Sequence, residues 1–269
     1  MKKLFYLKWL FLVGIAGFLL GKDDLKVFLI FIIIFIIDFI YKYIENVKAL
    51  PYYNQWLRQK WGQKYLERKY KNNAISIDNH VFVNEYILPF KGEWFVEYGG
   101  INKASSHSWN LISQRYAYDF EIRDEDNKIY NKDFYDLNDN YCYGKEVIAP
   151  LDGVVVSIVD KFSDESMRLD RLANSSASDI RGNHIIIKHS NGEYSMLAHL
   201  LKGSILVKKN DCIKQGDVIA KCGNSGNTNG PHLHFQVSNG PSFTFNASLP
   251  IKFKGIGFIN APSNISNID

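Results

Sequence analysis

Two histidines stand two residues apart near the C-terminal end of the chain. Residues 230–235 have the sequence GPHLHF, which places His232 and His234 around a single leucine. If this segment is a β strand, alternate side chains share one face, so both imidazoles lie on one side while Leu233 and Phe235 face a core. Two imidazoles on one strand face suit a metal centre, or a metal ligand paired with a general base.

Another histidine and a carboxylate could complete such a centre. His199 ends an apolar, strand-like segment, and Asp119 ends the sequence QRYAYD at residues 114–119. Zinc hydrolases typically use three nitrogen or oxygen ligands from the protein and leave the fourth position for a water, whose pKa falls to about 7. The chain can therefore supply the residues of a hydrolytic zinc site.

The elements that must position these side chains are predicted to be β strands. From about residue 75 the sequence alternates between polar and apolar residues, with Gly and Asn at turns. We predict strands at residues 81–86, 94–98, 116–121, 146–149, 154–159, 184–189, 194–199, 218–220 and 232–237. Residues 161–179, rich in Ser, Asp and Arg, are predicted to form a surface loop or short helix. The pattern predicts an all-β domain of antiparallel strands over residues 75–269.

The order of these motifs resembles a known enzyme family. Residues 144–153, GKEVIAPLDG, resemble the G-x-x-V-x-A-P-x-D-G hairpin of the M23 (LytM/lysostaphin-like) zinc metallopeptidases. Residues 182–200 resemble the next strands of that family, and residues 214–226 resemble the segment before its H-x-H strand. The resemblance implies Zn²⁺ as cofactor, hydrolysis of peptide bonds in peptidoglycan cross-links, and a compact antiparallel β fold. Carrier domains of the lipoyl or phosphotransfer kind share the A-P-x-D-G hairpin, but the HLH strand argues against them.

The resemblance also implies roles for individual residues. Asp119 and His234 correspond to metal ligands, and His199 and His232 to the catalytic pair. Many members carry another ligand, a histidine, four residues before the aspartate, where this chain has Arg115, and a guanidinium cannot ligate zinc. In a subset of similar sequences the histidine lies farther upstream of a Q-R-Y-A-x-D motif, and His107 fits that variant. We therefore predict a metal site of His107, Asp119 and His234. The alternative is a catalytically degenerate M23-like binding or scaffolding module of the cell envelope.

The first 44 residues have a different composition. Residues 4–20 are apolar except for Lys8, and residues 27–40 are a run of Ile and Phe interrupted by Asp38. A membrane-spanning helix needs about 20 apolar residues. We therefore predict that residues 1–44 form transmembrane helices, arranged as a hairpin of two spans. A signal-like segment over residues 1–21 is the alternative, although no small-residue cleavage site follows it.

Residues 45–74 form a basic, amphipathic stretch after the apolar region. Its aromatic residues Trp56, Trp61 and Tyr65 recur at helical spacing among basic residues. Glu45 and Glu67 are the only acidic residues in the stretch. Such a juxtamembrane linker is typical of a helix that contacts anionic membrane lipids, or of an ordinary solvated helix, and the sequence favours neither.

Charge and cysteine content exclude other classes of protein. The net charge of the 269 residues is +4, which is too small to indicate nucleic acid as the main partner. The three cysteines, Cys142, Cys212 and Cys222, cannot form a disulfide framework and are predicted to be buried. The positive-inside rule places the basic stretch in the cytoplasm, whereas a cell-wall hydrolase must face outward. We predict a membrane-anchored protein whose catalytic domain is extracytoplasmic, in the bacterial cell envelope.

Overall fold

The computed structural model describes the chain apart from residues 1–7, 72, 169–172, 174–176 and 268–269. The start of the first apolar segment and part of the predicted loop at residues 161–179 therefore lie outside the described residues. The chain divides into two compact units, Met1–Leu50 and Pro51–Asp269.

The described part of the first unit is helical. It contains η1 (Lys8–Leu10), α2 (Phe11–Leu19), α3 (Asp23–Lys26), η2 (Val27–Ile30) and the beginning of α4 (Phe31–Tyr70). Helix α2 packs closely on the following turns, because a Cβ atom on Gly17 would lie 2.4 Å from the Cβ of Leu25. Residues 8–30 of the described chain therefore fold back on themselves at the turn after α2, while the hairpin arrangement of residues 1–44 as a whole stays a prediction.

One helical stretch among the described residues, Asp23–Ile44, is long and apolar enough to cross a membrane. Helix α2 has nine residues, compared with the roughly 20 that a span requires. The described residues therefore contain one candidate span, and the prediction of two transmembrane helices overstated their number.

The second half of α4 belongs to the β-rich unit. Leu66 is completely buried and packs with Ile112 and Ala247. The Ile112 N–H donates to Gln63 Oε1 at 2.9 Å. A Cβ atom on Gly62 would lie 2.3 Å from the carbonyl oxygen of Thr244, so glycine permits the close approach of helix and loop. The opposite face of the helix exposes aromatic residues, with Lys60 3.6 Å above the ring of Trp56.

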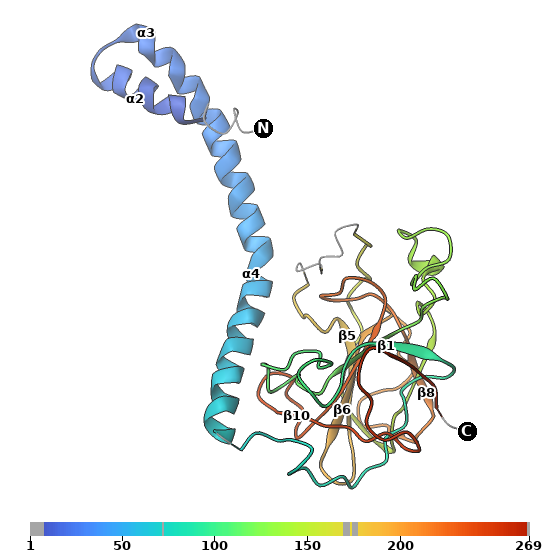
Figure 1. Cartoon of the computed structure of the whole chain (residues 1–269). Coiled ribbons are helices and arrows are strands. Elements are labelled where there is room, and N and C mark those ends of the chain that lie inside the picture. Colours follow the sequence, from blue (N-terminus) through green and yellow to red (C-terminus); the bar gives the residue numbers. More distant parts are fainter. Residues whose placement is uncertain (1–7, 72, 169–172, 174–176, 268–269) are drawn as a thin grey trace. The chain divides into compact units, whose positions relative to one another are not determined.

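The β-rich unit is built on a large antiparallel sheet (Figure 1), which confirms the predicted all-β fold. Its strands run in the order β11-β1-β2-β9-β6-β5-β4-β7, with β10 paired to β9. The bounds are β1 (Trp94–Tyr98), β2 (Tyr118–Glu121), β4 (Gly153–Val159), β5 (Asn183–Lys188), β6 (Tyr194–Leu200), β7 (Cys212–Ile213), β9 (Leu233–Ser238), β10 (Ser248–Leu249) and β11 (Ser263–Ile265). A second sheet pairs β3 (Glu146–Ile148) with β8 (Val218–Lys221), and η3 (Leu137–Asp139) lies before it in the chain.

The main core lies against one face of the large sheet. Leu233, Phe235 and Val237 of β9 enter it, together with Phe120 of β2 and Ile185 of β5. The alternate residues of β9, His234 and Gln236, are also buried. Because side chains alternate along a strand, these polar residues lie on the other face of the sheet, as the HLH pattern predicted.

Two sequence-based expectations were wrong. Residues 81–86 do not form a strand; Tyr86 makes an isolated bridge to Phe253. Side-chain hydrogen bonds hold this segment instead, because the Tyr86 hydroxyl and the Asn84 amide both donate to Glu193 at 2.7 Å. Cys142 and Cys222 are buried as expected, but Cys212 is exposed because it lies on the short edge strand β7.

Candidate metal centre

Adjacent strands bring Asp119 and His234 together. Asp119 on β2 is the register partner of His234 on β9, so the two side chains project from the same face of the sheet. His234 Nδ1 lies 2.8 Å from Asp119 Oδ1. Both residues are buried.

His107 reaches the same point from the loop that precedes β2. Arg115 closes this loop, because its Nε donates to the Trp109 carbonyl at 2.8 Å and its guanidinium lies 4.9 Å from the centre of the Trp109 ring. The Ser106 hydroxyl donates to the Arg115 carbonyl at 2.6 Å. The closed loop places His107 Nε2 3.2 Å from Asp119 Oδ2. Arg115 therefore braces the loop rather than entering the site.

The three side chains form a compact set of metal-ligating atoms. One candidate ligand atom from each of His107, Asp119 and His234 lies within 4.8 Å of the others. Two imidazole nitrogens and one carboxylate oxygen are a donor set that zinc accepts in catalytic sites, where a further position stays open for water or substrate.

His234 lies between Asp119 and Gln236, with Nδ1 toward Asp119 and Nε2 toward Gln236. The Gln236 amide nitrogen donates to the Ser113 carbonyl at 3.3 Å, which leaves its Oε1 as an acceptor 3.2 Å from His234 Nε2. In the tautomer that donates to Gln236, His234 carries its proton on Nε2, and the lone pair of Nδ1 points at a carboxylate oxygen. Two acceptors 2.8 Å apart need a proton or a metal cation between them. The donor set thus fits a metal ion.

His107 has no such second contact. Among the residues that the structure describes, its buried Nδ1 has no hydrogen-bond partner. The polar contact of the ring is therefore the one through Nε2, toward Asp119. This orientation directs Nε2 into the cluster.

His199 and His232 lie beside the cluster with their rings 4.6 Å apart. His199 Nδ1 is 2.8 Å from the Ser225 carbonyl, and His232 Nδ1 is 2.8 Å from the Gly230 carbonyl. A carbonyl only accepts hydrogen bonds, so Nδ1 carries a proton in both rings, and in the neutral form of each ring Nε2 has a free lone pair. His232 Nε2 lies 3.8 Å from Asp119 Oδ1. The backbone of His199 has a φ of 60°, a conformation that is uncommon for residues other than glycine.

Burial and charge set the protonation of these groups. Burial alone would raise the pKa of Asp119, but attraction to His107 and His232 and the close contacts with His107 and His234 lower it well below its ordinary value. The pKa of His107 is raised, because attraction to Asp119 outweighs the effect of burial. Burial, followed by repulsion from His232 and His234, lowers the pKa of His199 far below its usual value. His199 is therefore neutral at pH 7.

The centre opens into a cavity of about 130 Å³. Its lining combines the metal-ligating side chains with polar and apolar neighbours: His107, Gln114, Ile180, Arg181, Ala198, His199, Asn227, His234 and Phe243. Within the described part of the chain, the buried Oδ1 of Asn227 has no hydrogen-bond partner. It can accept a hydrogen bond from a ligand in this cavity.

All five predicted site residues thus lie in one cluster. Sequence reasoning missed Gln236, Arg115 as a brace, and Asn227. The alternation of β9 could have identified Gln236, because residues 232, 234 and 236 share one strand face. No sequence pattern signalled the contacts of Arg115 and Asn227, which depend on loop conformation.

Part of the β-rich unit is similar to proteins of a known family. Residues 137–244 match the model of peptidase family M23. That range includes His199, His232 and His234, whereas His107 and Asp119 lie upstream of it. The chain is 43% identical to the peptidoglycan DD-endopeptidase ShyB of Vibrio cholerae over 72 residues, which are 26% of this chain and 16% of ShyB. It is 38% identical to ShyA of the same organism over 72 residues, again 26% of this chain and 16% of the relative. The chain thus spans about a sixth of the length of these relatives.

Solved structures of similar proteins include a zinc-containing peptidase from Vibrio cholerae, with 23% identity and a TM-score of 0.36, covering 62% of this chain and 41% of that one. The catalytic domain of lysostaphin from Staphylococcus simulans has 19% identity and a TM-score of 0.33, covering 59% of this chain and 88% of that one.

Proposed function

We propose that this chain, which carries a peptidase M23 domain over residues 137–244, is a membrane-anchored zinc metalloendopeptidase that hydrolyses peptide bonds in peptidoglycan cross-links. The observation that carries the proposal is the cluster of His107, Asp119 and His234, whose ligand atoms lie within 4.8 Å of one another. The naming of two relatives as peptidoglycan DD-endopeptidases supports the choice of substrate.

His107 would hold Zn²⁺ through Nε2, Asp119 through its carboxylate and His234 through Nδ1. A bound zinc ion supplies Lewis acidity, which lowers the pKa of a water molecule and polarises a carbonyl group. The hydrogen bond from His234 Nε2 to Gln236 keeps Nδ1 unprotonated for this role.

His232 is the general base in this proposal. Its Nδ1–H donates to the Gly230 carbonyl, so Nε2 is free to take a proton from the attacking water. The water oxygen bonds to the carbonyl carbon, the C–N bond breaks, and His232 returns the proton to the leaving amine. His199 is neutral and presents an unprotonated Nε2, so it accepts a hydrogen bond from the water and orients it.

The alternative, a degenerate binding or scaffolding module, rests on Arg115 at the usual ligand position. The position of His107 beside Asp119 favours the enzyme, because it supplies the imidazole that Arg115 cannot.

In the proposed organisation, residues 1–44 anchor the chain, residues 45–74 form a basic juxtamembrane segment, and residues 75–269 form the catalytic domain. The candidate span Asp23–Ile44 supports the anchor. The exposed aromatic and basic face of α4 supports contact with membrane lipids. The domain would lie outside the cytoplasm, where cross-linked peptidoglycan is found. Protease added to intact cells should degrade it, and protection of the domain would contradict this placement.

The activity is tested with the full chain purified in detergent. It should contain one zinc ion per chain and cleave cross-linked peptidoglycan peptides, and chelation should abolish cleavage. The His107→Ala variant should lose both metal and activity, whereas His189→Ala, a buried histidine bonded to Ser195, should retain the metal. Full activity of the zinc-free protein would refute the proposal.

A further inference from the structure

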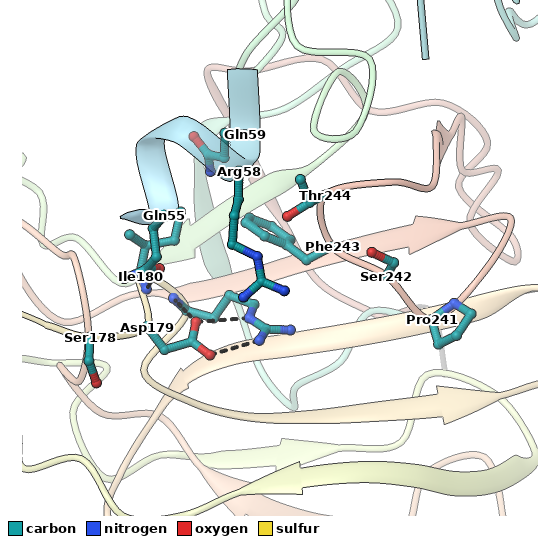
Figure 2. Close-up of a pocket in the computed structure, with 11 residues that line it drawn as sticks. Gln55, Arg58, Gln59, Ser178, Asp179, Ile180, Pro241, Ser242, Phe243 and Thr244 are labelled. Carbon is teal, nitrogen blue, oxygen red and sulfur yellow. Dashed lines mark hydrogen bonds and ion pairs between the residues drawn. The ribbon is translucent and has the colours of Figure 1, made fainter. Parts of the chain in front are cut away.

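A second cavity lies next to the metal centre and includes part of helix α4 in its wall. Its volume is about 260 Å³, and it shares Ile180, Arg181 and Phe243 with the cavity of the metal centre. Gln55, Arg58 and Gln59 of α4 line one side, and the loops at residues 178–181 and 241–244 line the rest (Figure 2). We propose that this cavity is a subsite for a carboxylate of the peptide substrate, with Arg58 as its cation. This inference rests on the proposed function and adds a determinant of specificity to it.

The helix is held in place as a wall of the cavity. The Gln55 side-chain amide pairs with the backbone of the neighbouring loop, since its Nε2 donates to the Ala177 carbonyl at 3.1 Å and its Oε1 accepts from the Ile180 N–H at 2.6 Å. About two turns farther along, Gly62 packs against Thr244, and about one turn beyond it Leu66 is completely buried. These contacts fix the backbone from which Arg58 extends.

The charges that line this cavity leave one positive charge without compensation. Arg181 is bonded twice to Asp179, at 2.9 and 2.7 Å, and its guanidinium lies 5.5 Å from the centre of the Phe243 ring. Arg58 forms no hydrogen bond or ion pair with any residue that the structure describes. Two arginines and one aspartate among the lining residues give a net charge of +2 − 1 = +1.

The position of Arg58 directs this charge into the cavity. Figure 2 shows its side chain extending from the helix toward Asp179 and Phe243. A guanidinium offers a planar fork of donors that matches a carboxylate. The amides of Gln55 and Gln59 stand beside it and add polar groups to the wall.

The shared lining favours a peptide as the source of the anion. A peptide that lies across the metal centre reaches the second cavity past Ile180 and Phe243, which belong to both. A lipid phosphate has the same chemistry, and the experiment must separate the two sources.

The test uses the full, zinc-loaded chain in detergent and pairs of cross-linked peptides. Each pair consists of one peptide with a free carboxylate at a given position and one peptide with a carboxamide at the same position. The set of pairs covers positions on both sides of the scissile bond. For one such pair, Arg58→Gln should lower kcat/KM of the acid about tenfold, mainly by raising KM, and leave the amide within about twofold. Arg58→Lys should retain part of the preference for the acid. Lys60→Gln removes the same charge from the side of the helix where Lys60 stacks on Trp56, and should have no effect.

Binding of fluorescent acid and amide peptides to the zinc-free chain gives a readout that needs no catalysis. An acid preference that Arg58→Gln abolishes supports the subsite even if no peptide is cleaved, in which case the proposed enzymatic function alone would fail. If the enzyme is active and Arg58→Gln changes kcat/KM of the acid and of the amide equally in every pair, the proposed carboxylate subsite is overturned. The full chain is also placed in lipid nanodiscs. Loss of the acid preference when phosphatidylglycerol is added to phosphatidylcholine would assign the cavity to lipid phosphate and overturn the proposal.

Discussion

Replacement of Gln236 by leucine should weaken zinc binding without removing a ligand. Gln236 is 1% exposed, and its Oε1 is the acceptor 3.2 Å from His234 Nε2. Leucine has a similar size but accepts no hydrogen bond. The proton of His234 can then move to Nδ1, the nitrogen that lies 2.8 Å from Asp119 and would ligate the metal. Zinc binding must then move the proton from Nδ1 back to Nε2, and this lowers the zinc affinity.

The expected loss follows from the role of the hydrogen bond. Removal of a group that orients a metal-ligating histidine typically weakens metal binding about 10- to 100-fold. This range corresponds to about 1.4 to 2.8 kcal/mol of binding free energy. The effect should fall at the lower end, because the 3.2 Å contact is longer than a strong charge-assisted hydrogen bond.

Competition with a chromophoric chelator measures the zinc affinity of the full chain. The Gln236→Glu variant keeps an acceptor at the same place and should bind zinc at least as tightly as the wild type. Gln215→Leu is the matched control, because the Gln215 side-chain amide donates to the Glu85 and Pro150 carbonyls and lies outside the metal centre. If Gln236→Leu binds zinc with wild-type affinity, Gln236 does not set the tautomer and the argument is refuted.

Further outcomes separate the other roles. His199→Ala should retain zinc but lose about 10²- to 10⁴-fold in kcat, as measured by metal analysis and peptide cleavage, and loss of the metal would instead identify His199 as a ligand. Arg115→Met removes the hydrogen bond to Trp109 and should weaken zinc binding several-fold through looser placement of His107, so an unchanged affinity in the chelator assay would contradict the brace. Glu193 has a pKa of about 2 in the folded protein, compared with an ordinary 4.5, because hydrogen bonds from His80, Asn191, Tyr86 and Asn84 outweigh its burial. These bonds stabilise the fold above about pH 4.5 and are lost as pH falls toward 2. Glu193→Gln should therefore lower Tm most near neutral pH and by a vanishing amount near pH 2, and a constant difference across this range would exclude the linkage.

The parts of the site on regular strands could be predicted from the sequence. Alternation along residues 232–237 placed His232 and His234 on one face, and the antiparallel sheet then set Asp119 opposite His234. The same alternation places Gln236 on the face of the strand that carries His232 and His234. The positions of these side chains depend on neighbouring residues or on one pair of strands, so they can be predicted from a sequence pattern.

The parts on loops depend on contacts between distant residues. His107 stands twelve positions before Asp119, and its return to the cluster requires the bonds of Arg115 to Trp109 and of Ser106 to Arg115. The sequence offered His107 through a resemblance, not through a spacing that geometry dictates. Residues 81–86 illustrate the opposite error, because their alternation suggested a strand while side-chain bonds to Glu193 hold the segment. Alternation indicates which residues are buried, but it does not determine whether a neighbouring strand is available for pairing.

A single candidate span also changes the argument about membrane orientation. With two spans, the basic residues after residue 44 would place the β-rich unit in the cytoplasm. Asp23–Ile44 is the one candidate span among the described residues, and for it basic residues on both sides must be compared within about 15 to 20 positions of its ends. Within 15 positions the N-terminal side carries Lys8 and Lys22, and the C-terminal side carries Lys48 and Arg58. A window of 20 positions adds Lys3 on the N-terminal side and Lys60 and Lys64 on the C-terminal side. The two sides differ by at most one basic residue, so the charge rule gives little preference for either orientation. The extracytoplasmic placement therefore depends on the proposed function, because cross-linked peptidoglycan lies outside the cytoplasm.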